Sequence, residues 1–303
     1  MTWYGRCIFL SWYCDIGTCK FCYRSTQKNR IKNAQNARRS RESIVVETLL
    51  ARELKWRIEF LTGGYRIYSF EEIKAFCKLV SDIYGEKIWI NLGVLNNQEI
   101  EELRPYIIGV VASIECVNEN LHRMVCPDKE IKPYIEMLKG LHDLKKSITL
   151  VIGLGNENKE DVWDFVDNLG LDRITFYALK PVKDTTYTSG PSTEEYVTWI
   201  KDCRIRFPNL EIIAGITLRR VHEVDLLLKA GANAITKFPI TKVFGSDKAK
   251  EFVERALKCG PFESELVKLP KINWEQKINE LNITKELKEK TKILLNSYLK
   301  KMG

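Results

Sequence analysis

The sequence predicts an α/β fold, a full (β/α)8 barrel of the TIM type with a C-terminal helical extension. The chain has 303 residues, of which 45% are hydrophobic and 29% charged, and these are ordinary values for a globular protein large enough for such a barrel. Short apolar runs alternate eight times with amphipathic windows, as they do in successive βαβ units. Runs such as 107–111 are apolar at nearly every position, which is typical of parallel strands buried on both faces.

The predicted elements alternate from one end of the chain to the other. Strands are expected at 7–12, 57–61, 87–93, 107–115, 147–154, 172–178, 209–215 and 233–237. Helices are expected at 43–56, 70–84, 97–105, 129–143, 158–169, 192–206, 220–230 and 247–258. An open, doubly wound parallel sheet is the alternative arrangement of the same elements.

Capping residues support these boundaries. Ser69 and Ser192 precede acidic first turns, where a hydroxyl caps the free amides and a carboxylate favours the positive end of the helix. Gly85, Gly140 and Gly170 stand where helices are expected to end. The barrel is expected to span residues 1–259, and residues 260–303 to form a linker and a Lys/Glu-rich helix at 283–301 that packs on the outside or bottom of the barrel.

Nine cysteines and only three histidines direct attention to thiol chemistry. The sequence has neither an apolar run of membrane-spanning length nor the cleavage site of a signal peptide, so a cytoplasmic location and no membrane partner are expected. In a reducing compartment, cysteines serve metal or redox chemistry more often than structural disulfides.

Basic residues are concentrated between Arg24 and Arg41. This segment, the basic collar, holds seven lysines and arginines and no acid, and it accounts for nearly all of the net charge of +8. A solvated loop is one interpretation, and a surface that attracts an anionic substrate or an acidic partner is the other.

The most informative feature is the cysteine loop, Cys14 to Cys22, which places three thiols within nine residues directly after the first strand. In a barrel this loop lies at the C-terminal mouth, where active sites are built. Three thiolates without a local fourth suit an iron–sulfur cluster with one open iron, because a structural zinc site closes its shell with four ligands. A zinc site completed by a distant cysteine and three buried free thiols remain as alternatives.

The cysteine loop is similar to the signature of the radical SAM superfamily, in which an aromatic residue, here Phe21, precedes the last cysteine. The superfamily spacing is Cys-x3-Cys-x2-Cys, and this chain has one residue more in the first gap. The resemblance implies that Cys14, Cys19 and Cys22 hold three irons of a [4Fe–4S] cluster and that S-adenosylmethionine (SAM) chelates the fourth. An electron from a donor such as ferredoxin or flavodoxin would split SAM into a 5′-deoxyadenosyl radical that abstracts hydrogen from a substrate.

The resemblance also assigns SAM contacts on the first strands. Residues 61–65 resemble the family's Gly-Gly-Glu segment, with Thr62, Gly63 and Gly64 near the methionine amino group and Tyr65 in place of the acid. A simple glycine turn is the alternative for this segment. Glu115 ends the fourth strand, where a carboxylate faces the barrel mouth rather than the packed interior, and it is expected to contact SAM.

Further contacts follow from the likeness to the group of biotin synthase, the FeFe-hydrogenase maturase and methylornithine synthase. Lys132 is the nearest match to that group's carboxylate-binding arginine. Gly153 and Gly155 resemble the adenine-side glycine motif, and Tyr177 would flank the base. A dinucleotide fingerprint is excluded at these glycines because the third glycine is absent.

Two specific reactions are consistent with these residues. The first is hydrogen abstraction from a small molecule in cofactor biosynthesis, as in the radical SAM proteins of the iron-guanylylpyridinol hydrogenase cofactor, which also have a longer first gap. The second is an archaeal-type lipoyl synthase, in which Cys7, Cys116 and Cys126 would hold an auxiliary cluster and the basic collar would dock an acidic carrier protein. Biotin synthase chemistry is disfavoured because the strand positions at 58–61 and 89–92 look apolar.

Two other functional classes, an RNA-modifying enzyme and an electron carrier, fit the sequence less well. An RNA-modifying radical enzyme would use the basic collar for phosphates, but no RNA-binding domain is visible, so nucleic acid is not the expected partner. An electron carrier needs neither eight barrel units nor an open iron. Arg219 and Arg220 follow the seventh strand and are candidates for binding an anionic substrate group, with a surface pair as the alternative.

Overall fold

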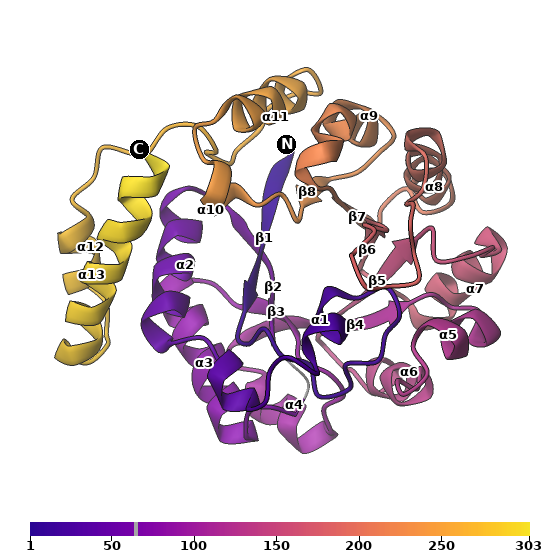
Figure 1. The fold of residues 1–303 in the computed structure, drawn as a ribbon, viewed down its shortest axis with the longest axis horizontal. Helices are drawn as coiled ribbons and strands as arrows, with labels where there is room; N and C mark the ends of the chain where they lie inside the picture. The colour runs from indigo at the N-terminus through magenta and orange to yellow at the C-terminus, as the bar shows by residue number, and fades with distance from the viewer. Residues whose placement is uncertain (64–65) are drawn as a thin grey trace.

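The computed structural model describes residues 1–63 and 66–303, and these form a closed barrel of eight parallel strands in sequence order. Figure 1 looks into the ring of strands and the helices around it. The strands are β1 Trp3–Phe9, β2 Arg57–Thr62, β3 Ile88–Asn91, β4 Ile107–Glu115, β5 Lys145–Ile152, β6 Arg173–Ala178, β7 Glu211–Gly215 and β8 Ala234–Thr236. The predicted barrel is confirmed, and the open sheet is wrong because β8 pairs with β1.

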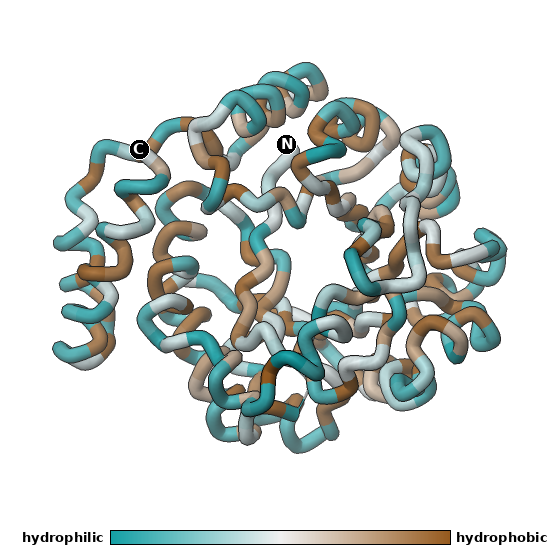
Figure 2. The backbone as a smooth tube through the Cα atoms, in the orientation of Figure 1, coloured by the Kyte–Doolittle hydropathy of each residue, from teal (hydrophilic) through white to brown (hydrophobic). Residues whose placement is uncertain are grey.

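The helices of the first half are α1 Tyr23–Gln27, the 3-10 turn η1 Ala34–Ala37, α2 Arg41–Glu53, α3 Phe70–Tyr84, α4 Asn97–Leu103, α5 Glu119–Val125 and α6 Lys132–Lys139. Those of the second half are α7 Lys159–Leu169, α8 Thr193–Arg206, the 3-10 turn η2 Leu218–Glu223, α9 Val224–Lys229, α10 Ile240–Val243, α11 Asp247–Leu257, α12 Trp274–Asn279 and α13 Lys285–Met302. Hydrophobic and hydrophilic residues alternate along the outer helices (Figure 2). Their apolar faces pack on the strands as one continuous core.

The predicted caps form where they were expected. The Ser69 hydroxyl accepts a hydrogen bond from the Glu72 amide, and the Glu72 carboxylate accepts one from the Ser69 amide, while the Ser192 hydroxyl accepts from the Glu195 amide. Gly85 and Gly170 end their helices in the left-handed conformation, with φ of +89° and +58°. Gly140 also follows the last residue of its helix, but with right-handed geometry.

Three predicted elements differ more from the structure than the others do. The first strand was expected at 7–12 but spans Trp3–Phe9, because Gly5 and Arg6 interrupt the apolar run that the prediction followed. The helix expected at 129–143 is shorter, and the separate helix α5 precedes it. The helix expected at 220–230 is divided between η2 and α9, and Arg220 inside η2 has non-helical φ and ψ.

The C-terminal helix α13 packs against α2 and α12 on the outside of the barrel, as predicted (Figure 1). Leu295 and Met302 are buried in this contact. Among the described residues, no helix is long and apolar enough to cross a membrane.

Candidate functional site

The cysteine loop follows β1 at the C-terminal mouth of the barrel, where it was predicted. In the segment that leads from β1 into the loop, Leu10 donates its amide hydrogen to the Thr62 carbonyl oxygen on β2 at 2.6 Å. The far end of the cysteine loop lies on the other side of the mouth, because the Lys20 amide donates to the carbonyl oxygen of Val125 at the end of α5 at 2.8 Å. Phe21 and Cys19 pack against an apolar cluster from β4, α5, β5 and the loop after β6. The loop therefore lies over the β2 to β5 side of the opening.

The three thiols of the loop have different surroundings, and each is partly exposed. Cys19 accepts a hydrogen bond from the Cys126 thiol, and this bond lowers the pKa of Cys19. Burial raises the pKa of Cys22. The Arg24 guanidinium acts against this burial and favours the thiolate form of Cys22.

The donor set fits an iron–sulfur cluster in its chemistry, because three cysteine sulfurs are the ligands that such clusters take. Across residues 1–63 and 66–303, no three Cys, His, Asp or Glu side chains are grouped closely enough to hold one metal ion. A cluster does not require such a group, since each thiolate ligates a different iron. Which atoms ligate the cluster therefore stays a prediction.

The basic collar is largely used to hold the cysteine loop and the following segment in place. Lys28 donates from Nζ to the Asp15 and Ile16 carbonyl oxygens, at 2.9 and 2.6 Å. Arg24 donates to the Ser11 carbonyl oxygen at 3.1 Å. The remaining contacts are Arg30 with Asp184, Arg38 with Glu72, Arg39 with Glu47, and Arg41 over the ring of Phe76. Three of the seven collar cations, Arg30, Arg38 and Arg39, are thus paired with carboxylates of the fold.

Glu115 ends β4 beside the cysteine loop. Its φ is +69°, and the register between β4 and β5 slips by one residue just before it, so the strand end is bent at this point. Lys129 donates to Glu115 Oε1 at 2.8 Å, and both side chains are largely buried, at 8% and 14% exposure. Burial acts to lower the pKa of Lys129, but the Glu115 carboxylate outweighs it and the pKa is raised.

Lys132, by contrast, does not reach this ion pair. It begins α6 with 83% of its side chain exposed, and its Nζ lies 3.8 Å from Glu136 on the same helix. The buried cation near Glu115 is therefore Lys129, which sequence reasoning missed. Its position three residues before Lys132, directly after the Cys-Pro-Asp turn, is the signal that could have identified it.

The glycines assigned to SAM lie at points of close backbone approach. A Cβ on Gly63 would lie 2.9 Å from Leu10 Cβ, so this glycine lets the end of β2 touch the segment that leads into the cysteine loop. Gly64 and Tyr65 lie outside the described residues. A Cβ on Gly155 would lie 2.8 Å from Leu121 of α5, and Gly153 has a φ of +101°. Thr62 donates its hydroxyl to the Asn91 carbonyl at 2.8 Å.

A buried carboxylate, Glu59, lies inside the barrel below the mouth, and sequence reasoning missed it by treating residues 58–61 as apolar. The register between β1 and β2 skips Glu59, which is the extra residue of a β-bulge. A bulge re-aims the side chains of a strand and is frequent beside active sites. Glu59 Oε1 accepts from the Tyr177 hydroxyl at 2.6 Å, and Oε2 accepts from the Cys7 thiol at 2.8 Å and from the Thr236 hydroxyl.

Tyr177 therefore points into the barrel toward β2. Burial raises the pKa of its hydroxyl well above 10, and the adjacent Glu59 adds to this effect. Burial likewise raises the pKa of Cys7 to about 12, so its thiol is protonated at neutral pH. The proposed contact between Tyr177 and adenine stays a prediction.

The three cysteines of the predicted auxiliary cluster are not brought together. Cys116 and Cys126 share an apolar cluster with Leu121 and Val151. Cys7 lies in a different cluster, inside the barrel with Phe60 and Trp89. The described residues contain no three-cysteine group at this place.

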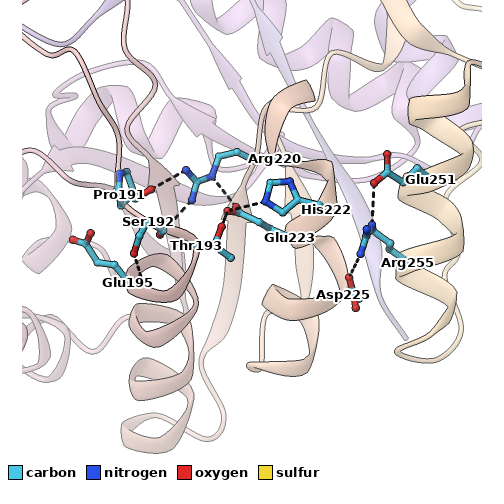
Figure 3. A network of polar contacts seen from close by, with 10 residues as sticks. All are labelled: Pro191, Ser192, Thr193, Glu195, Arg220, His222, Glu223, Asp225, Glu251 and Arg255. Atoms are coloured by element: carbon cyan, nitrogen blue, oxygen red, sulfur yellow. Dashed lines mark hydrogen bonds and ion pairs between the residues drawn. The ribbon is translucent and has the colours of Figure 1, made fainter.

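Arg219 and Arg220 have different surroundings, although they are adjacent. Arg220 donates to Glu223 Oε2 at 2.7 Å and to the Pro191 carbonyl at 2.9 Å, and Glu223 also accepts from the Thr193 hydroxyl at 2.5 Å (Figure 3). This network joins η2 to the start of α8. Arg219 is exposed and lines a pocket at the mouth.

Comparison with known proteins agrees with this geometry. The family model described as "Radical SAM superfamily" matches residues 10–169. An uncharacterized protein of Methanocaldococcus jannaschii is 35% identical over 99% of this chain and 89% of its own length. The 7,8-didemethyl-8-hydroxy-5-deazariboflavin synthase of Archaeoglobus fulgidus is 27% identical over 48% of each chain.

Two solved structures have the same fold. Methylornithine synthase (PylB) superposes with a TM-score of 0.66 at 20% identity, over 78% of this chain and 71% of its own. HydG, a maturase of the [FeFe]-hydrogenase, superposes with a TM-score of 0.63 at 11% identity, over 99% of this chain and 82% of its own. Both likenesses concern the barrel as a whole.

Proposed function

The chain belongs to the radical SAM superfamily and is therefore an enzyme that uses a [4Fe–4S] cluster and SAM, and from this premise we propose its ligands and its type of substrate. Cys14, Cys19 and Cys22 hold the cluster, and the enzyme abstracts hydrogen from a small organic molecule in cofactor biosynthesis. When bound, the cluster and SAM supply the electron transfer and the radical chemistry, while the protein orients the substrate and excludes water.

One observation carries the assignment of ligands. The three-thiol loop lies at the C-terminal mouth of a complete barrel, inside the matched range 10–169. The Arg24 guanidinium beside Cys22 favours the thiolate form that metal ligation needs. The packing of Phe21 and Cys19 against the apolar cluster at β4 and β5 would limit access of water to this side of the mouth.

The SAM side of the site is proposed on the β2 to β5 arc. Gly63 and Gly155 lie against Leu10 and Leu121 at distances that a Cβ would not allow, so these glycines let the segments on this side of the mouth pack closely. The Glu115 and Lys129 side chains offer a carboxylate and an ammonium group, which match the amino and carboxylate groups of an amino acid such as the methionine part of SAM.

Support for cofactor biosynthesis comes from the relatives. By name, one is a synthase of a deazariboflavin and another is a maturase of the [FeFe]-hydrogenase. A precursor of a hydrogenase cofactor is one class of substrate that fits this proposal. Three of the seven cations of the basic collar are paired with carboxylates of the fold, and this pairing weakens the case for docking of an acidic carrier protein.

The proposal is tested by anaerobic reconstitution with iron and sulfide, followed by addition of dithionite and SAM. About four irons per chain and the formation of 5′-deoxyadenosine are expected. About eight irons would instead support an auxiliary cluster and the lipoyl synthase alternative. Failure to form 5′-deoxyadenosine at full iron loading would contradict the proposal.

A further inference from the structure

A second part of the barrel mouth, away from the cysteine loop, contains a large pocket. It has a volume of about 740 Å³ and is lined by the C-terminal ends of β6 and β7, the residues after β8, and the loops that follow β6 and β7. None of the residues assigned to the cluster lines it. The glycines and the Glu115–Lys129 pair of the proposed SAM side also lie outside it, and only Tyr177 is common to both.

The charge of this pocket is entirely positive. Its lining includes Lys180, Arg219, Arg220 and Lys237 and no aspartate or glutamate. Arg220 is paired with Glu223 and forms part of the pocket wall. For the other three, the described residues provide no carboxylate in ion-pair contact, and the acid of the 180–190 loop, Asp184, is paired with Arg30. Three exposed cations thus face one cavity without a counter-ion from the protein.

Lys237 is the cation that connects the pocket to the barrel axis. It directly follows β8 and has a φ of +63°, a conformation that a non-glycine residue adopts only at some cost and that is concentrated at functional sites. Its Nζ lies 4.8 Å from the centre of the Tyr177 ring and 5.1 Å from that of Phe9. Aromatic faces hold a cation in place without neutralising its charge, so its N–H groups can serve an anion.

The pocket wall is built to keep its shape. Arg220 ties η2 to Pro191, beside the Thr188 and Gly190 lining, so that the neighbouring Arg219 is carried at the rim. The remaining lining includes the apolar side chains of Leu179, Ile216 and Leu218. A ligand complementary to this pocket therefore combines an anionic group with an apolar body.

We propose that this pocket binds the substrate, and that the substrate is an organic anion, a carboxylate or a phosphate, whose charged group is held by Lys237 with Arg219 and Lys180. This inference rests on the proposed function, because it takes the β2 to β5 arc as the SAM side. It deepens that function by placing the substrate on the β6 to β8 arc, above the Glu59–Tyr177 floor. An arginine contributes a planar pair of donors and a lysine a point charge, and both suit carboxylates and phosphates.

The test uses calorimetric binding of three matched probes to the reconstituted full-length protein. Phenyl phosphate and benzoate share an apolar ring and differ in the anionic group, and benzyl alcohol has the ring without charge. Saturable binding of at least one anion and none of benzyl alcohol is expected. Stronger binding of phenyl phosphate identifies a phosphate substrate, and stronger binding of benzoate a carboxylate substrate.

Variants locate the binding. Lys237→Met should weaken the preferred anion about 10-fold or more, and Lys237→Arg should restore most of the affinity. Lys139→Met, which removes the same charge from an exposed side chain on α6, should leave the affinity within about twofold. If Lys237→Met does not fold, Arg219→Met provides the same readout at the rim.

Equal weakening by Lys139→Met, or no saturable binding of either anion, would overturn the inference. Because binding is measured without SAM cleavage, the two proposals can fail separately. Formation of 5′-deoxyadenosine without anion binding would contradict only the substrate site. Anion binding without 5′-deoxyadenosine would contradict only the proposed radical function.

Discussion

At the scale of single residues, the Lys129–Glu115 ion pair is the buried contact that ties the segment after α5 to the end of β4. Removing the cation should leave a largely buried carboxylate without its partner. Lys129→Met is therefore expected to lower the free energy of unfolding by about 3 kcal/mol. Urea denaturation of the purified variant measures this loss.

Lys132→Met is the matched control, since Lys132 is 83% exposed and its partner lies on the same helix. It should change the unfolding free energy by less than about 0.5 kcal/mol. Equal losses in the two variants would show that the Lys129–Glu115 contact does not stabilise the fold.

Glu157 predicts a pH dependence of stability. Burial raises the pKa of its carboxyl to about 7, although it accepts a hydrogen bond from the Val117 amide at 2.9 Å. Since the folded pKa lies above the ordinary value of 4.5, the unfolded state releases the proton first as the pH rises. The contribution of Glu157 to stability is therefore fully present below 4.5 and is lost as the pH rises to about 7.

Urea denaturation near pH 5 and near pH 8 tests this sign, because the higher value lies about one unit above the pKa of Glu157 in the folded protein. Glu157→Gln cannot ionise, so its stability relative to the unmodified protein should be greater at the higher pH than at the lower. The same stability difference at both pH values would contradict the assignment.

The residues that could be predicted from the sequence are those with a local signal. The cysteine loop, Glu115 and Arg219 stand at strand ends, and the structure places them at the mouth. Glu59 could not be predicted, because its role depends on a partner 118 residues away and on a bulge that no spacing reveals. Lys129, whose partner is 14 residues away, had only its place after the Cys-Pro-Asp turn as a signal. Arg220 was assigned to the substrate together with Arg219, but the buried Glu223 holds it in the wall.

At the scale of elements, the packing of β6 against β7 depends on one glycine. A Cβ on Gly215 would lie 2.2 Å from Cδ1 of Tyr177, whose ring is held in place by the hydrogen bond to Glu59. Gly215→Ala should therefore lower the free energy of unfolding by about 1–3 kcal/mol, the range of overpacking in a core. Thermal or urea unfolding measures the change.

Gly140→Ala provides the comparison for this variant. Gly140 has right-handed helical geometry, and the nearest atom to an added Cβ is 3.5 Å away. Its replacement should be neutral or stabilising by about 0.4–1 kcal/mol. If both alanine variants lose the same stability, the Gly215–Tyr177 contact does not account for the effect.

Element types could be predicted more accurately than their boundaries. Long amphipathic windows such as 70–84 were located to the residue, because capping residues and glycines mark both ends. Strand β1 was misplaced, because its ends depend on pairing with β8. Helix α5 was missed, because it depends on packing beneath the cysteine loop. A short stretch of sequence does not indicate such non-local contacts.

At the scale of the whole molecule, closure of the barrel divides the mouth into two arcs with different chemistry. The β2 to β5 arc carries the cysteine loop, the glycines and the Glu115–Lys129 pair, and the β6 to β8 arc carries the uncompensated cations. The alternation of elements could predict the barrel, because eight regular βα units have few ways to bury both faces of their strands. The different chemistry of the two arcs could not be predicted, because it depends on which charged side chains remain without a counter-ion in the closed barrel.

The central claim is that Cys14, Cys19 and Cys22, and no other cysteine, hold the cluster at which SAM is cleaved. It is tested most directly by measuring iron content and 5′-deoxyadenosine in four alanine variants, at each of these positions and at Cys126, which contacts Cys19 but lies outside the loop. The three loop variants should lose both signals and Cys126→Ala should keep both. Full product from any loop variant, or loss of the cluster in Cys126→Ala, would contradict the account.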